Sequence, residues 1–171
     1  MRFNDGKLLL DPYAKAVTRK FRNVDNLLLA YDARPGAADG ALDTRDNTTV
    51  VPKSTVIDDA FDWQGVGSPD LALEELVMYE VHVNGFTAHP SSGVTLPGTY
   101  LGFIEKIAHL ARLGVNAVEL LPLHEFYVED LFLQKGLTNY WGYNSIGFFA
   151  PESSCGSGRT PGCQVGADSG R

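Results

Sequence analysis

The pattern of hydrophobic and polar positions changes near residue 76 of this 171-residue chain. Before that point, residues 1–70 carry short apolar runs interrupted by Pro, Gly and Asp, without a sustained helical period. This pattern predicts short strands and loops. Within this part, residues 33–47 are polar and small, so we expect them to form an exposed loop.

Two later segments have the composition of buried strands. Residues 76–83 are mostly β-branched or apolar and are followed by Asn84-Gly85, a typical turn pair. Residues 115–121 form a second such run, which Pro122 closes. Both segments are therefore predicted to be largely buried strands.

A helix is predicted between these strands, over residues 100–113. Thr99 is suited to cap it, apolar residues recur at three- and four-residue spacing, and Gly114 suits its C-terminal end. The order strand, helix, strand, with a short turn before the second strand, implies a right-handed unit with parallel strands. The predicted fold class is therefore α/β.

No third strand is predicted after this unit. Residues 122–150 are interpreted as a long aromatic loop, and a tail rich in Gly and Ser follows it. Two parallel strands alone form neither a barrel nor a stable open sheet, because their edges and faces stay uncovered. The α/β architecture is therefore expected to be incomplete.

Charge and cysteine content narrow the classes of partner and location. The chain has 14 basic and 21 acidic residues, a net charge of −7, and no cluster of Lys and Arg. Nucleic acid and membrane surfaces are therefore not expected as partners. The first residues lack an apolar run long enough for a signal peptide, and Cys155 and Cys163 lack the neighbours of a disulfide framework or a zinc site. These features favour a cytoplasmic protein.

The aromatic loop holds the side chains best suited to a ligand. In α/β barrels the site is built from loops that follow the carboxyl ends of the strands. Flat rings beside amide or acid hydrogen-bonding groups suit a sugar ring. A loop of this kind can also be a hydrophobic plug that closes a core, and the pattern alone leaves this alternative open. The loop residues concerned are His124, Glu125, Tyr127, Asn139, Tyr140, Trp141, Tyr143 and Asn144.

Isolated polar residues in the predicted strands have simpler interpretations. His82 lies between two valines, so a hydrogen-bonded strand histidine is favoured over a substrate contact. Glu119 faces away from Val118 and Leu120 and is expected to need a structural partner in a buried strand.

The sequence also lacks the Gly-rich nucleotide-binding motifs, the zinc peptidase motif and the serine nucleophile elbow, so hydride transfer, phosphoryl transfer, zinc peptidase and serine esterase activities are not supported.

Several segments, in the order of the family, resemble the isoamylase-type or glycogen-debranching branch of the alpha-amylase clan of glycoside hydrolases. The resemblance covers about residues 3–164. The segments are residues 7–16, 51–54, 61–63, 77–87, 97–100, 114–122 and 139–152. One such segment would be a weak signal, whereas this many in order form a specific one.

The resemblance implies a (β/α)8 TIM barrel that hydrolyses α-1,6 branch linkages in glycogen or branched maltodextrin. Residues 1–70 would be the end of a β-sandwich carbohydrate-binding module and a linker, and residues 71–171 the first two strands and one helix of the barrel. The clan's Asp nucleophile and Glu acid/base lie on later strands, so the chain is expected to be an inactive fragment. The alternative is a non-catalytic α-glucan-binding or regulatory fragment.

The resemblance also supplies the candidate substrate-binding residues. Tyr143 resembles the tyrosine that stacks under the sugar ring at the cleavage subsite. Trp141 stands where relatives often hold a hydrogen-bonding His. Asn139 and His124, from the same aromatic loop, complete the predicted substrate-binding set, and no catalytic residue is predicted within the chain.

Three departures from the family bear on these expectations. Glu125 resembles an acidic position that ligates calcium in some isoamylases, but Phe126 and Tyr127 replace the neighbouring oxygen-bearing residues, so no metal or other cofactor is expected. Asn84 replaces a common Arg or Lys. Residues 166–171 do not continue into the second barrel helix, as a gene fragment would explain.

Overall fold

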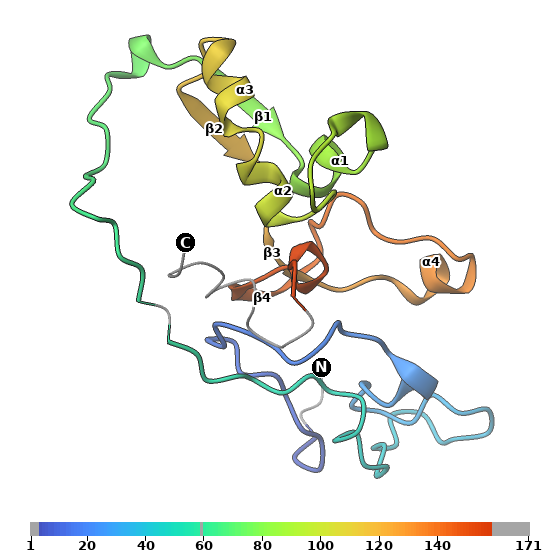
Figure 1. The fold of residues 1–171 in the computed structure, drawn as a ribbon. Helices are drawn as coiled ribbons and strands as arrows, with labels where there is room; N and C mark the ends of the chain where they lie inside the picture. The colour runs from blue at the N-terminus through green and yellow to red at the C-terminus, as the bar shows by residue number, and fades with distance from the viewer. Residues whose placement is uncertain (1–3, 59, 159–171) are drawn as a thin grey trace.

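Two separate two-stranded sheets organise the computed structural model, which describes residues 4–58 and 60–158. In the first sheet β1 (Met78–Val81) pairs in parallel with β2 (Ala117–Leu120), so that Met78 lies opposite Ala117 (Figure 1). The predicted parallel strand–helix–strand unit is therefore confirmed. The tail at residues 166–171 and Cys163 lie outside the described residues.

The first strand is shorter than predicted because a helix begins at its end. The His82 side chain accepts a hydrogen bond from the Gly85 amide and thereby caps α1 (Val83–Thr87). Asn84-Gly85 consequently lies inside a helix, and the predicted turn at this pair is wrong. The 3₁₀ turn η3 (Pro90–Ser92) follows α1.

The predicted helix over residues 100–113 forms as two pieces, α2 (Tyr100–Ile104) and α3 (Ile107–Arg112). Thr99 caps α2 as expected, accepting from the Gly102 amide at 3.1 Å. The interruption lies at Glu105 and Lys106, and the exposed Glu105 carboxylate accepts a hydrogen bond from the Thr95 amide. The α2 side chain Phe103 packs on Phe86 of α1, with 5.6 Å between ring centroids.

The predicted aromatic loop contains a second sheet and is thus only partly a loop. β3 (His124–Phe126) pairs antiparallel with β4 (Ser145–Pro151), with an irregular register on both sides of Glu125. Between them lies α4 (Asp130–Gln134), and η4 (Ser153–Cys155) follows β4.

The N-terminal segment, residues 4–58, forms turns and isolated bridges in place of the predicted strands. Side chains as well as backbone groups bond its backbone: the Asn47 side-chain amide accepts from the Leu8 N–H and donates to the Leu8 carbonyl oxygen. Residues 33–47 are only partly the exposed loop expected, because Asp43 and Asn47 are each 1% exposed. Arg45 and Lys7 hold the pKa of Asp43 well below its usual range. The only helical turn in this segment is η1 (Val24–Asn26).

This N-terminal segment packs against the second sheet, as Figure 1 shows for the blue chain beneath β4. Ala14 and Val17 form a small core with Ala150 of β4, and Tyr13 stacks on Phe149 at 5.6 Å. Residues 60–72 then run as an extended, exposed arm to η2 (Leu73–Glu75) and β1.

The first sheet is largely uncovered, so the prediction that residues 76–83 and 115–121 form largely buried strands is wrong. Uncovered faces follow from the absence, in the described part of the chain, of further strands and helices to cover these two. Met78 and Val118 are 55% and 41% exposed. Glu119 is also exposed, so the buried partner predicted for it is not needed. Within the described residues, no helix is long and apolar enough to cross a bilayer.

Candidate functional site

The turn that carries most of the predicted site residues is closed by hydrogen bonds to one carboxylate. Asn139 donates to Glu129 Oε2 at 3.2 Å, and Asn144 donates to Glu129 Oε1 at 3.3 Å. The Asn139 side-chain oxygen accepts from the Gly142 amide at 3.0 Å. Gly142 has a φ of 74° and lies against Phe126, where a larger residue would be strained. We call residues 139–144 the aromatic turn.

The aromatic turn presents three aromatic rings to solvent, of which Tyr140 is 47% exposed. Trp141 is 58% exposed and Tyr143 is 71% exposed. Tyr140 meets Trp141 edge to face, with ring centroids 5.5 Å apart. Exposed flat rings held on an anchored turn are suited to stacking on a sugar ring.

The aromatic turn is also joined to the end of β1. The His82 and Tyr140 rings are stacked, with centroids 4.2 Å apart and an interplanar angle of 10°. His82 Nε2 lies 2.6 Å from the Tyr140 carbonyl oxygen, which can only accept, so Nε2 is the donor. A cavity of about 120 Å³ next to this contact is lined in part by His82, Asn84, Asn139 and Tyr140.

Three of the four predicted substrate-binding residues are therefore brought together and one is not. Asn139, Trp141 and Tyr143 share the aromatic turn, whereas His124 begins β3 and its ring lies 5.7 Å from that of Phe148 on β4. His82 was predicted to be a hydrogen-bonded histidine, and it is one. Its contact with Tyr140 could not be read from the pattern, because the two residues are far apart in sequence.

Two buried carboxylates converge on one lysine behind the aromatic turn. Lys20 forms an ion pair with Glu152, and its ammonium lies 3.6 Å from Glu125 Oε1. The same ammonium sits 3.5 Å from the centre of the Phe126 ring. Glu125 Oε2 accepts from the Ser153 amide at 2.8 Å, whereas Oε1 has no hydrogen-bond donor among the described residues.

Burial raises the pKa of Glu125, with the Lys20 ammonium offsetting part of this rise and the Glu152 carboxylate adding to it. The cluster consequently carries one more carboxylate than it has cations. Lys20 was absent from the sequence-based candidates, because a lone lysine in a segment without helical or strand pattern gives no signal of burial.

The structure offers few groups for a metal ion. Within residues 4–58 and 60–158, no three His, Cys, Asp or Glu side chains are grouped as a metal site. Glu125 and Glu152 both lie beside Lys20, which already supplies a positive charge there. Cys155 is a buried free thiol, and burial raises its pKa to about 11.

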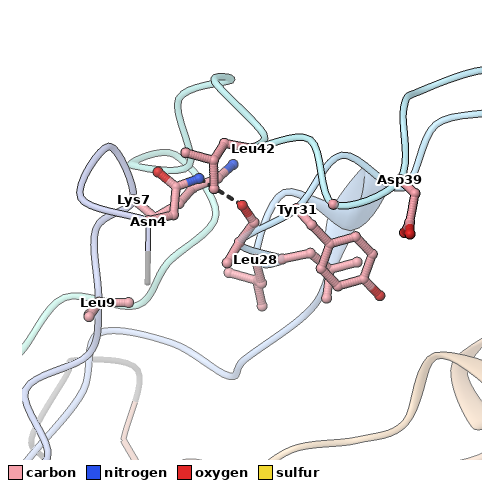
Figure 2. Close-up of a pocket in the computed structure, with 10 residues that line it drawn as sticks. Asn4, Lys7, Leu9, Leu28, Tyr31, Asp39 and Leu42 are labelled. Atoms are coloured by element: carbon pink, nitrogen blue, oxygen red, sulfur yellow. Dashed lines mark hydrogen bonds between the residues drawn. The ribbon is translucent and has the colours of Figure 1, made fainter. Parts of the chain in front are cut away.

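A larger hollow lies elsewhere, in the N-terminal segment. It has a volume of about 820 Å³ and is mostly apolar. Figure 2 shows Leu28, Tyr31 and Leu42 around it, with Lys7 and Asn4 at one side. None of the predicted substrate-binding residues lines it, so it is separate from the aromatic turn.

Comparison with known proteins identifies the relatives of this chain. No family model matches it. The glycogen debranching enzyme of Enterobacter sp. (strain 638) is 41% identical over 153 residues, which are 88% of this chain and 22% of that protein. The enzyme of the same name from Salmonella paratyphi B is 41% identical over 159 residues, 91% of this chain and 23% of that protein. The resemblance to glycogen debranching enzymes is confirmed. The chain spans less than a quarter of these debranching enzymes.

Solved structures agree with this relationship. The type I pullulanase of Bacillus subtilis, complexed with maltose, matches with a TM-score of 0.60 and 26% identity, over 91% of this chain and 19% of that one. The catalytic module of the glycogen-degrading pneumococcal virulence factor SpuA matches with a TM-score of 0.60 and 27% identity, over 91% and 22%. These matches are consistent with the start of an α/β barrel, whereas the described residues form two small sheets and not a complete barrel.

Proposed function

We propose that this chain supplies part of the glucan-binding wall of an enzyme that hydrolyses α-1,6 branch linkages in glycogen or branched maltodextrin. The proposal is carried by the 41% identity to a glycogen debranching enzyme over 153 residues, together with the exposed, anchored aromatic turn. An α-glucan presents flat, apolar sugar faces, and Trp141 and Tyr143 offer exposed rings that match them.

The proposed roles differ among the four site residues. Tyr143 stacks under the sugar at the cleavage subsite, and Trp141 provides a second flat face. Asn139 keeps the aromatic turn in place through Glu129 and Gly142. His124 contacts the glucan from β3, on the neighbouring sheet.

The proposed division into domains follows from the similarity to glycogen debranching enzymes. Residues 1–70 are the end of a β-sandwich carbohydrate-binding module and a linker, and residues 71–171 begin the catalytic barrel. The Asp nucleophile and Glu acid/base belong to later barrel strands, so residues 1–171 bind without catalysing. The function needs neither a metal nor another cofactor, and it is carried out in the cytoplasm.

A binding assay and a debranching assay on the chain test this proposal together. Amide hydrogen exchange with maltohexaose is expected to show added protection in residues 139–144, and reducing ends should not be released from glycogen. Turnover by the chain would contradict the proposed absence of catalytic groups. Failure to bind maltohexaose at millimolar concentration would contradict the proposed wall.

A further inference from the structure

We propose that His82 is a positioning residue that fixes the aromatic turn against the end of β1, and that Gly85, which has no side chain, leaves the room that Tyr140 occupies. This inference rests on the proposed function for its effect on glucan binding. Its structural part, the control of the turn by His82 and Gly85, can be measured without any ligand.

Both ring nitrogens of His82 form hydrogen bonds, one as an acceptor and the other as a donor. Nδ1 accepts from the Gly85 amide at 3.0 Å, so it carries no proton. Nε2 donates to the Tyr140 carbonyl oxygen at 2.6 Å. The neutral imidazole with its proton on Nε2 satisfies both contacts. One side chain therefore caps α1 and holds the aromatic turn at the same time.

The stacked rings add a constraint on orientation. His82 and Tyr140 lie nearly parallel at 4.2 Å, and Tyr140 in turn meets Trp141 edge to face. A chain of contacts thus runs from the end of β1 through Tyr140 to the exposed Trp141 ring. Fixing that ring before binding lowers the entropy lost when it stacks on a sugar.

A glycine is needed at position 85 because Tyr140 occupies the room of a side chain, and not because the backbone conformation requires glycine. It lies inside α1, where alanine would be the better helix former. A Cβ at this position would overlap the Tyr140 hydroxyl oxygen, while the ring carbon Cζ would be 3.2 Å away. Removal of the hydroxyl therefore removes the overlap, and the ring needs to shift by only a few tenths of an ångström to admit an alanine.

The first test separates the two tasks of His82. In H82N the shorter amide side chain can still cap α1, because Asn is among the best N-cap residues, but it cannot stack on Tyr140. We expect faster exchange of the Gly142 amide, which donates to Asn139 within the turn, with unchanged exchange in β1 and β2. Binding of maltohexaose should weaken about tenfold, the equivalent of one lost hydrogen bond of about 1.4 kcal/mol.

The second test is a double-mutant cycle that uses Gly85. We expect G85A to loosen the aromatic turn although it favours helix formation, Y140F alone to leave the turn unchanged, and the double variant G85A/Y140F to restore the protection that G85A loses. Trp141 fluorescence provides a second readout of the same cycle, because Tyr140 contacts its ring.

Two results would overturn the positioning role. Unchanged exchange of the turn in both H82N and G85A would show that these contacts do not fix it. Equal loss of protection across β1, β2 and the turn would show that His82 is needed for folding in general. If the turn responds as expected but the wild-type chain binds no maltohexaose, the positioning holds and the proposed glucan-binding function fails.

Discussion

Lys20 and Glu125 bring together two parts of the chain that are more than 100 residues apart, with the ammonium 3.6 Å from Glu125 Oε1. Lys20 belongs to the N-terminal segment and Glu125 to β3. Glu152, which follows β4, completes the cluster through its own ion pair with Lys20. The N-terminal segment is therefore attached to the second sheet by buried charge as well as by the small apolar core around Val17 and Ala150.

Removal of the lysine charge should destabilise the protein strongly. K20M keeps most of the side-chain volume but leaves two buried carboxylates without a cation, which costs about 3–5 kcal/mol when a buried pair is broken. Urea denaturation followed by circular dichroism measures the change. K135M, at the exposed C-terminal end of α4, is the matched control and should change stability by less than about 0.5 kcal/mol. Equal effects of the two variants would contradict a stabilising cluster.

Stability should also fall as Glu125 ionises. Because burial raises its pKa above the ordinary value of 4.5, the folded state binds this proton more tightly than the unfolded state. This stabilisation is complete below pH 4.5 and is lost as the pH rises through the folded pKa. Each unit by which the pKa of Glu125 in the folded state exceeds that in the unfolded state corresponds to about 1.4 kcal/mol of unfolding free energy.

The E125Q variant tests that pH dependence. Glutamine keeps an acceptor for the Ser153 amide and has no proton to lose, so the unfolding free energy of E125Q should fall less than that of the wild type as the pH rises above 4.5. E119Q, at an exposed position of β2, should retain the wild-type dependence. Parallel pH profiles for all three proteins would show that Glu125 does not titrate in this range.

The first sheet was predictable because its signals are local. The run at 76–83 has strand composition, Thr99 caps the helix and Gly114 ends it with a φ of 85°. The boundaries were less predictable, because His82 begins a helix where the composition still favours a strand. The predicted parallel pairing followed from chain connectivity alone.

The second sheet could not be predicted from local pattern. β3 has three residues, and its partner β4 begins about 20 residues later with an irregular register. A strand this short and irregular leaves no alternation to detect. In the N-terminal segment, side chains such as Asn4 and Asn47 bond the backbone, so the apolar runs do not need to form strands.

The sequence predicted only those residues of the candidate site that belong to the motif shared with the family. Tyr143 and Trp141 were identified through the resemblance, and both are exposed on the aromatic turn. Glu129 anchors that turn from the preceding helix α4 region, 10 residues from Asn139, and His82 stacks on it from a position 58 residues away along the chain. Such contacts depend on packing and leave no periodic signal in the sequence.

The anchor of the aromatic turn should be sensitive to charge. N139D keeps an acceptor for the Gly142 amide but places a second carboxylate beside Glu129, where Asn139 now donates. We expect loss of the turn's amide protection and weaker maltohexaose binding, with a local cost of about 1–3 kcal/mol. Q134E adds the same charge on α4 and should leave exchange in the turn unchanged. An undisturbed turn in N139D would show that Glu129 is not its anchor.

The exposed tyrosine of the turn should affect binding far more than stability. Tyr143 is 71% exposed, so Y143A should change the unfolding free energy by no more than about 0.5 kcal/mol. Isothermal calorimetry with maltohexaose should show at least about a tenfold loss of affinity in Y143A, while Y143F, which keeps the ring, should bind as the wild type. Y13A removes a tyrosine that is 73% exposed but belongs to the N-terminal segment, so it controls for the loss of an exposed ring. If Y13A and Y143A bind maltohexaose equally well, Tyr143 does not contribute to the proposed glucan-binding wall. If only Y143A is impaired, its ring makes a contact that the free protein leaves open to solvent.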